Sequence, residues 1–354
     1  MRRSHFVLLA LGLFLAAQPL IAATYYVGYC EKGAFSSIQA AVTAVPGGST
    51  VEVCPGYYAE QVVIDKALTL EAIPGSLAGP VVIFDGGVSL VTTTSIYWGT
   101  VAPQIQVTAG PVNITNINVL QSNPSGCPAT EIAIFYSSGS SGTVNGVETN
   151  GNCNFNSIGI AAENGAGATR SIKIENSQIN AGSSAGISVG SNQTPSSLTA
   201  VVENNFLYAN SSVAILALGN VEGSISNNSI ASSPNWSTTG VAVWSGNVTV
   251  SENRIDQQYT GIDIEAPGVS VTSNQIFGTA LGINIGAGNA LVKGNTITYS
   301  LGDGIVFSCT TGNTVTKNVI NNANIGLDWV PDGFIGSNTF YNVNTRISSG
   351  GGCS

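Results

Sequence analysis

A short pattern of apolar and polar positions repeats through the second half of the chain. An aliphatic residue, two variable positions, Asn, one further residue and an aliphatic are followed, after a gap, by Gly-aliphatic-x-apolar. The Asn of the regular copies falls at Asn253, Asn274, Asn295 and Asn318, in steps of 21, 21 and 23 residues. A fixed period of this length with short β-type segments predicts a solenoid of stacked coils.

The apolar positions of successive copies are expected to stack inside the solenoid, with the residue between them facing out. Asn tolerates left-handed backbone, and its amide can bond its copy one coil away, which predicts an Asn ladder. The first predicted interior column is Val241, Ile262, Ile283, Ile305 and Leu327, and the second is Val243, Ile264, Ile285, Phe307 and Trp329.

A helix is predicted near the N-terminus, where residues 35–45 carry apolar side chains at helical spacing. Ser36 is a candidate N-cap, and Pro46-Gly47-Gly48 is the expected stop. It is the only helix that the pattern predicts outside the first 23 residues. Short strands are expected at residues 50–54, 62–64, 68–70 and 81–84, separated by turn residues.

The opening segments, Phe35–Val42 and Val51–Leu70, resemble the N-terminal cap and first coils of the right-handed parallel β-helix family. This family includes the pectin-lyase-like proteins, the pectin methylesterases and the periplasmic NosD-type repeat proteins. The resemblance covers residues 25 to about 90, and the repeats extend it to about 340. It implies an all-β, single-stranded right-handed parallel β-helix whose cap, residues 25–48, includes a short helix that covers the apolar end. It implies no activity, because the family hosts lyases, hydrolases, epimerases, esterases and proteins without known catalysis.

Residues 1–23 are predicted to be a secretory signal peptide, with a basic start, an apolar run over residues 6–17 and the small residues Ala22 and Ala23 at its end. The run is too short for a good membrane span, and no other stretch approaches spanning length. Residues 24–354 are expected to form one domain, with its regular repeats at about 170–340. The protein is predicted to be secreted, periplasmic or attached to the cell surface, and its oligomeric state stays open.

Six cysteines in an exported chain predict disulfides, because the destination is an oxidising compartment. Cys30 and Cys54 lie roughly one coil apart, as do Cys127 and Cys153, and a bond between Cys309 and Cys353 would fasten the C-terminal end. Spacing alone does not fix the pairing. A metal site is the weaker interpretation of these cysteines, because their spacings are long and no histidine accompanies them.

The chain is acidic, with 10 Lys and Arg against 19 Asp and Glu. Two of the basic residues and the single histidine lie in the predicted leader, so the rest is more acidic still and has no histidine. Nucleic acids and anionic membranes need clustered positive charge, so neither is an expected partner. A polyanionic sugar such as pectate would need a bridging divalent cation.

Two carboxylates are the best candidates for chemistry. Asp263 and Glu265 flank an interior position and are expected to face outward about 6.5–7 Å apart. This spacing falls in the range in which paired carboxylates hydrolyse glycosides with inversion. Asp328 lies in the outward column of Asp263, and Arg254 is the arginine nearest the acidic patch. The alternative is that exposed acids keep a sheet face soluble.

Three tryptophans are candidate sugar contacts. Trp244 is expected one coil from Glu265, while Trp98 and Trp236 lie in insertions between repeats. Trp329 is assigned to the core instead.

Glu175, Glu203 and Glu252 each precede a turn Asn, and a column of carboxylates could hold calcium. A solvated edge is the favoured interpretation of this column. No other cofactor and no other metal is predicted.

The absence of histidine excludes several activities known in the family. It removes the Gly-His-Gly motif of polygalacturonases, the Asp-Pro-His-Glu motif of mannuronan epimerases and, together with the lack of methionine beyond the leader, the natural copper ligands. The favoured hypothesis is an exported protein that binds polysaccharide. The alternatives are a glycoside hydrolase or polysaccharide lyase that acts through Asp263 and Glu265 with Arg254 or Asp328, and a structural or adhesion protein of the cell surface.

Overall fold

The computed structural model describes residues 22–73, 79–87, 89–121, 129–151, 156–165, 167–180, 183–192, 197–208, 212–232, 238–308, 310–332, 334 and 336–350. Residues 1–21 of the predicted leader lie outside this set. So do Cys127, Cys153, Cys309, Cys353 and Trp236, for which the sequence-based predictions stand untested.

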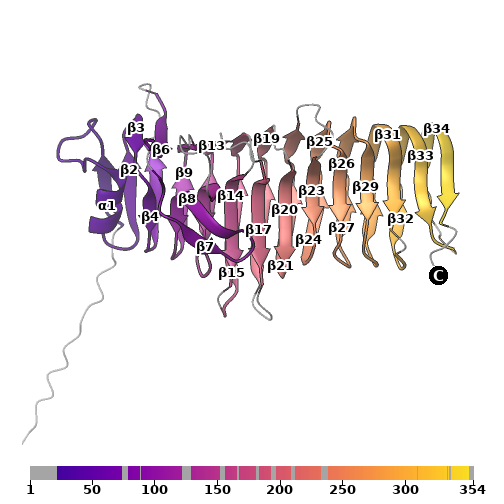
Figure 1. Ribbon diagram of the computed structural model, residues 1–354, viewed down its shortest axis with the longest axis horizontal. Coiled ribbons are helices and arrows are strands. Elements are labelled where there is room, and N and C mark those ends of the chain that lie inside the picture. Colours follow the sequence, from indigo (N-terminus) through magenta and orange to yellow (C-terminus); the bar gives the residue numbers. More distant parts are fainter. Residues whose placement is uncertain are drawn as a thin grey trace, which may run out of the picture.

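The chain winds into a parallel β-solenoid of about 11 turns, which confirms the predicted fold class (Figure 1). Three flat faces run the length of the solenoid, and we call them sheets 1, 2 and 3. Sheet 1 contains β1 (Thr24–Val27), β2 (Ser49–Val53), β5 (Leu68–Ala72), β9 (Val112–Thr115), β12 (Gly142–Asn145), β15 (Arg170–Glu175), β18 (Leu198–Glu203), β21 (Val221–Ser226), β24 (Asn247–Ser251), β27 (Ser270–Thr272), β30 (Leu291–Lys293) and β32 (Thr314–Thr316).

Sheets 2 and 3 follow sheet 1 within each coil, and they merge near the C-terminus, where one long strand serves both faces. Sheet 2 contains β3 (Gly56–Ala59), β6 (Val81–Phe84), β10 (Asn118–Gln121), β13 (Glu148–Gly151), β16 (Gln178–Asn180), β19 (Phe206–Tyr208), β22 (Ser229–Ala231), β25 (Arg254–Asp256) and β28 (Gln275–Phe277). Sheet 3 contains β4 (Val62–Ile64), β8 (Gly99–Val107), β11 (Thr130–Tyr136), β14 (Ser157–Asn164), β17 (Ala185–Ser191), β20 (Val213–Gly219), β23 (Thr239–Val243), β26 (Thr260–Ile264) and β29 (Leu281–Ile285). The merged strands are β31 (Thr296–Phe307), β33 (Val319–Val330) and β34 (Thr339–Ser349).

The core is a stack of aliphatic columns that runs along the solenoid axis. Val241 pairs with Ile262, Ile262 with Ile283, Ile283 with Ile305, and Ile305 with Leu327, so the first predicted interior column is confirmed. All five side chains are buried.

The second interior column is confirmed as far as Phe307, but its last member is wrong. Trp329 has a left-handed backbone (φ 56°), and its side chain is 50% exposed. The register between β33 and β34 shifts at this point, and Val330 is buried instead. A single left-handed residue breaks the two-residue alternation of a strand and turns its side chain outward.

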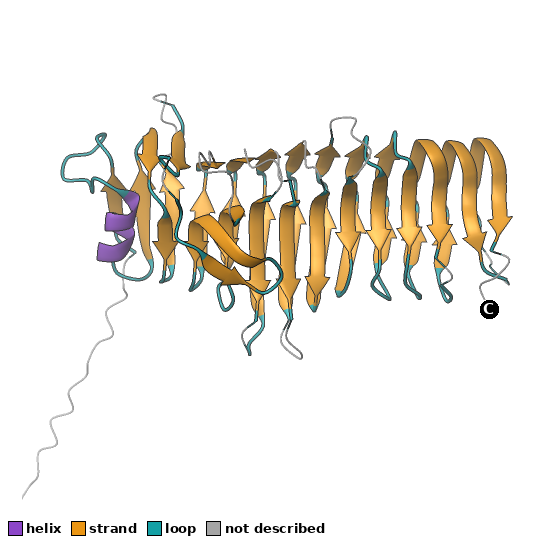
Figure 2. Ribbon diagram, in the orientation of Figure 1, coloured by secondary structure: helices purple, strands orange, loops and turns teal. Residues whose placement is uncertain are grey.

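The N-terminal cap follows the prediction with a shift of one residue. Helix α1 (Ile38–Ala44) begins after Ser37, whose hydroxyl accepts a hydrogen bond from the backbone N–H of Ala40, so the N-cap is Ser37 and not Ser36. Glu60 accepts from the N–H groups of Ile38 and Gln39, both at 2.8 Å. The helix lies over the end of the solenoid, where it buries its apolar side on the first coils (Figure 2).

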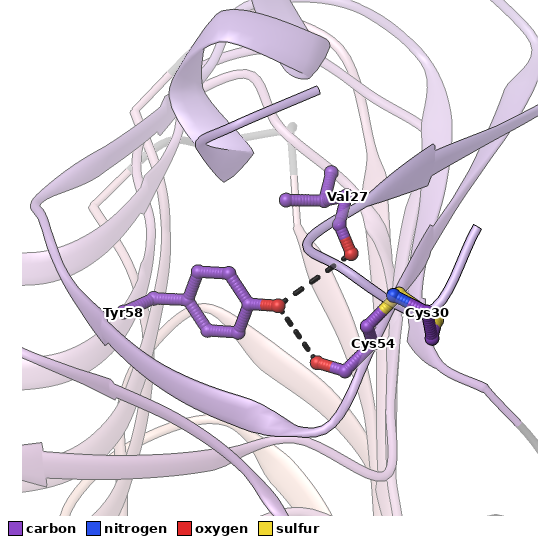
Figure 3. Close-up of a disulfide and its surroundings, with 4 residues drawn as sticks. All are labelled: Val27, Cys30, Cys54 and Tyr58. Carbon is purple, nitrogen blue, oxygen red and sulfur yellow. Dashed lines mark hydrogen bonds between the residues drawn. A yellow bond between two sulfur atoms is a disulfide. The ribbon is translucent and has the colours of Figure 1, made fainter. Parts of the chain in front are cut away.

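A disulfide joins Cys30 to Cys54, with Cα atoms 5.7 Å apart. It ties the turn after β1 to the end of β2, one coil further on. Beside it, the Tyr58 hydroxyl donates to the carbonyl of Cys54 at 2.8 Å and lies 3.5 Å from that of Val27 (Figure 3). Among the described residues, no helix has the length and apolarity needed to cross a membrane.

An Asn ladder fixes the corner between sheets 1 and 2. Along the ladder, the side-chain oxygen of each Asn accepts two hydrogen bonds from the ladder Asn of the preceding coil, one from its backbone N–H and one from its Nδ2. Asn253 donates both of these bonds to Asn274, each at 3.0 Å. Nδ2 of Asn274 in turn donates to the carbonyl of Val250 at 3.0 Å. The ladder runs through Asn205, Asn228, Asn253, Asn274, Asn295, Asn318 and Asn338.

The left-handed residue at this corner is the one before the ladder Asn, contrary to prediction. Glu252, Ser273 and Lys317 have φ between 58° and 59°. In the earlier coils, Asn176 and Asn204 are likewise the left-handed residues, so the ladder position falls one residue later than the sequence pattern indicated. The ladder amide must turn inward to reach its copy, and the residue before it makes the turn.

A hairpin inserted between β6 and β8 interrupts the regular succession of coils. Strand β7 (Thr93–Ser95) pairs antiparallel with the start of β8, and the residues between them lie over the outer surface of sheet 3 (Figure 1). Trp98 of this hairpin packs on Val101, Ile132 and Phe135 and their neighbours, a small apolar cluster outside the solenoid core. Part of sheet 3 is therefore covered, and the rest is open.

We expect Asn274→Ala to lower the free energy of unfolding by roughly 2–5 kcal/mol, because it leaves the buried backbone N–H of Asn253 without its acceptor and removes one hydrogen bond each from Nδ2 of Asn253 and from the carbonyl of Val250. The midpoint of urea denaturation measures the effect. Asn344→Ala is the matched control, since its amide bonds one exposed partner, Asn324, and should cost about 0.5 kcal/mol or less. Equal midpoints for the two variants would contradict a structural role for the ladder.

Candidate functional site

Two columns of residues face outward along sheet 3, and we call them together the outer strip. The first is Ala161, Ser188, Leu216, Ala242, Asp263, Asn284 and Val306, each paired in register with the next. The second lies two residues further along each coil and reads Glu163, Gly190, Leu218, Trp244, Glu265, Gly286 and Ser308. The outward direction predicted for Asp263 and Glu265 matches the observed register.

The two carboxylates share one hydrogen-bond donor. Nδ2 of Asn284, one coil further on, donates to Oδ1 of Asp263 at 2.8 Å and lies 3.3 Å from Oε1 of Glu265. The amide oxygen of Asn284 accepts from the hydroxyl of Ser308 at 3.1 Å. This chain of bonds orients Asn284 so that its NH₂ group faces both acids. The acids are thereby held beside each other.

The Glu265 carboxylate lies against the backbone of the next coil. The carboxylate occupies the space that a Cβ atom on Gly286 would take, so a side chain at Gly286 would displace Glu265 from this position. Burial raises the pKa of Glu265 above its ordinary value, and the negative charge of Asp263 raises it further. Glu265 therefore keeps its proton to a higher pH than an isolated glutamate does.

Asp328 belongs to the same outward column but not to this pair. It lies three coils beyond Asp263, roughly 14 Å along the axis. Its Oδ1 accepts from the backbone N–H of Trp329 at 2.9 Å. Its neighbour is Asp303 of β31, to which the sequence analysis gave no role; burial and then the charge of Asp328 raise the pKa of Asp303.

Arg254 lies on a different face from the acid pair. Its Nε bonds Oδ2 of Asp256 at 2.7 Å on sheet 2. Both residues line a small hollow with Gln275, Phe277 and Thr298. The structure thus gives Arg254 a carboxylate partner of its own and does not bring it to Asp263.

Trp98 and Trp244 line one open hollow of about 450 Å³ on the outer surface of β17, β20 and β23. Trp98 comes from the hairpin, and its indole Nε1 donates to Ser188 Oγ at 3.3 Å. Trp244 follows β23 and is 48% exposed. Val213, Leu216 and Ala242 form an apolar cluster beneath them, which Trp98 and Leu218 contact. The hollow ends one coil from Glu265, so aromatic rings and acids form one continuous surface.

The proposed carboxylate column on sheet 1 is not a row of three acids. Glu203 pairs with Glu175 on one side and with Ser226 on the other, and Glu252 sits outside the column because it makes the turn. Lys173 bridges Glu175 at 2.7 Å and Glu203 at 2.9 Å. In the described part of the chain, no three His, Cys, Asp or Glu side chains are grouped so that they could hold a metal ion.

Comparison with known proteins agrees with this architecture. Residues 195–353 match a family model described as "Right handed beta helix region". The chain has the right-handed parallel β-helix fold. A search of curated proteins finds no match.

Solved structures share the β-helix at low identity. The GH136 lacto-N-biosidase from Eubacterium ramulus is 10% identical, with 92% of this chain and 68% of that one aligned and a TM-score of 0.64. The Dettilon tailspike protein is 14% identical, with 85% and 62% aligned and a TM-score of 0.59. The catalytic domain of a GH87 alpha-1,3-glucanase is 14% identical, with 94% and 66% aligned and a TM-score of 0.54. Likenesses at this identity show the fold alone.

The sequence pattern did not identify two residues of this surface, Tyr97 and Asn284. Tyr97 packs its ring where a Cβ on Gly190 would lie, at 2.3 Å, and so belongs to the hollow. Asn284, between Asp263 and Val306 in the first outward column, was given no role by the sequence pattern. The sequence signal for both residues was a glycine in the second outward column. Gly190 leaves space for the Tyr97 ring, and Gly286 leaves space for the Glu265 carboxylate that Asn284 bonds.

We expect Asp263→Asn to lower the pKa of Glu265, because it removes one of the two causes that raise it. The pKa should stay above the ordinary value of 4.5, since burial is the larger cause and remains. A carbon-13 NMR titration of the Glu265 carboxyl measures this. Glu222→Gln, on sheet 1, should leave the titration unchanged, and an unchanged pKa in Asp263→Asn would refute the coupling.

The raised pKa of Glu265 also makes the stability of the fold depend on pH. The folded state binds the Glu265 proton more tightly than the unfolded state, so this group stabilises the fold below pH 4.5. That contribution declines as pH rises from 4.5 through the raised pKa. Asp263→Asn should narrow the pH range over which this contribution is lost, because it lowers the upper limit, the pKa of Glu265.

Proposed function

We propose that this β-helix protein binds a polysaccharide along the outer strip. One observation carries the proposal: Trp98 and Trp244, far apart in sequence, line a single open hollow whose end adjoins Asp263 and Glu265. An apolar floor with aromatic walls and a few converging polar groups is the usual make-up of a ligand site. The acids, Asn284 and Ser308 supply acceptors and donors for hydroxyl groups at one end.

The charge of the site favours a neutral sugar. Asp263 and Glu265 face outward together, and Arg254 is engaged with Asp256 on sheet 2. A uronate chain would meet two carboxylates with no cation beside them among the described residues that line the strip. Aromatic rings, in contrast, contact the apolar faces of neutral pyranoses. We therefore favour a neutral glycan over pectate.

Glycoside hydrolysis is the second candidate, and the geometry of the acid pair favours it. Glycosidases need one carboxyl that holds its proton and a second that acts as base or nucleophile. The raised pKa of Glu265 suits the general acid, and Asp263 beside it suits the second role. Asn284 would orient both groups. A polysaccharide lyase that uses an arginine base beside a bound calcium ion finds less support, because Arg254 lies on sheet 2, away from the acid pair.

The setting proposed for this activity is outside the cell or in the periplasm. The predicted leader directs export, and the disulfide between Cys30 and Cys54 is of the kind that persists in oxidising compartments. A structural or adhesion role at the cell surface is the remaining alternative, and it predicts neither saccharide binding at the hollow nor turnover.

Binding to xylan, laminarin, glucomannan, amylose and pectate tests the proposal. We expect at least one neutral glycan to bind and Trp244→Ala to weaken that binding by about tenfold, the equivalent of losing roughly 1.4 kcal/mol of ring contact. Isothermal titration calorimetry measures both. Tyr208→Ala is the matched control, because Tyr208 on sheet 2 is 45% exposed. No binding to any of the five, or equal losses in the two variants, would refute a site at the hollow.

Turnover is tested on the same five glycans by release of reducing ends and of unsaturated uronides. If the acid pair is catalytic, Glu265→Gln and Asp263→Asn should each lower the rate by about 100-fold or more. Binding should survive in both, because the tryptophans are untouched. Binding without product from the native protein would leave the protein a binding module and exclude the hydrolase.

A further inference from the structure

The outer strip is blocked at one end by the hairpin of residues 93–101. Going toward the N-terminus, the second column passes from Trp244 to Leu218 and then meets Gly190, over which the Tyr97 ring lies. Gly219 beside it has no room for a side chain either, because a Cβ there would meet the backbone oxygen of Ser191 and also the Tyr97 hydroxyl. The aromatic ring thus occupies the surface along which a bound chain would continue.

The hairpin is anchored rather than loosely draped. Glu163, the next member of the second column, is 3% exposed and accepts from the Ser95 hydroxyl and, at 2.8 Å, from the Ile96 N–H. Ser95 also accepts from the Trp98 N–H at 2.9 Å, which fixes the turn. With Trp98 bonded to Ser188, both outward columns hold the hairpin tip. Burial raises the pKa of Glu163, in keeping with a carboxyl enclosed by this contact.

The opposite end of the strip is open. The first column is buried from Ala161 through Ala242, but Asp263, Asn284 and Val306 beyond them are partly accessible. Glu265 and Ser308 in the second column are exposed. A chain lying on the strip can therefore leave it past the acids but cannot continue past the hairpin.

We propose that the outer strip binds the end of a glycan chain and not an internal segment, with the Tyr97 and Trp98 hairpin as the stop. This inference rests on the proposed polysaccharide binding. The stop lies three coils from Asp263, roughly 14 Å along the axis. That distance accommodates only a few sugar rings. If the acids cleave, the product is a short oligosaccharide taken from the chain end.

The test compares chains of equal mass and different length. Xylan, laminarin, glucomannan and amylose are each used intact and after partial acid hydrolysis, with ends counted as reducing sugar. End recognition predicts that affinity per unit mass rises in proportion to the number of ends, about tenfold for a tenfold shortening. Unchanged affinity per unit mass, with clear binding, would overturn end recognition and leave the proposed function intact. No binding to any of them would overturn both.

Tyr97→Ala assigns the effect to the hairpin. It removes the ring over Gly190 while the solenoid core and Trp244 stay in place. We expect the variant to bind intact and shortened chains with equal affinity per unit mass. Full retention of the preference for ends would show that the hairpin is not the stop. Tyr208→Ala should keep the native preference.

Discussion

Hydrogen bonding between successive coils is the constraint on which everything else in this molecule depends. Backbone groups bond along the axis, coil to coil, so each residue has a fixed neighbour one coil away. The Asn ladder reinforces this at one corner, since each buried amide bonds its copies on either side as well as a backbone carbonyl. A slip of one residue would break the ladder and turn a whole interior column outward. Register is therefore held over the length of the solenoid.

Fixed register converts sequence spacing into surface columns, and it also limits what those columns can carry. Identical charges in neighbouring coils would face each other at about 4.8 Å. The strip avoids this at Asp263, whose neighbours in the column are Ala242 and Asn284. On sheet 1, where Glu175 does face Glu203, Lys173 lies between them. The closest acids of the strip, Asp263 and Glu265, are neighbours along one strand, and a donor from the next coil joins them.

Structural features that follow from a periodic pattern could be predicted from the sequence, whereas features that interrupt the pattern could not. Interior columns from Val241 to Phe307, strands at 62–64 and 81–84 and the position of α1 follow from local periodicity, which the structure confirms. Trp329 was misplaced because a left-handed residue interrupts alternation without changing composition. The ladder was shifted in the earlier coils because Asn176 and Asn204 satisfy the turn as well as the ladder pattern. The meeting of Trp98 with Trp244 depends on where an insertion folds, and no period encodes that.

A solenoid that only repeats has an open surface from end to end, so repetition alone cannot distinguish one part of a long ligand from another. Direction has to come from an element outside the repeat that is held in place by it. Here the repeat supplies the holding residues, Glu163 and Ser188, and the gaps at Gly190 and Gly219 into which Tyr97 fits. The hairpin supplies the wall. In the proposed binding mode, selectivity for a chain end resides in an insertion of a few residues, while the acids and Trp244, which are proposed to contact the glycan, lie on the regular coils.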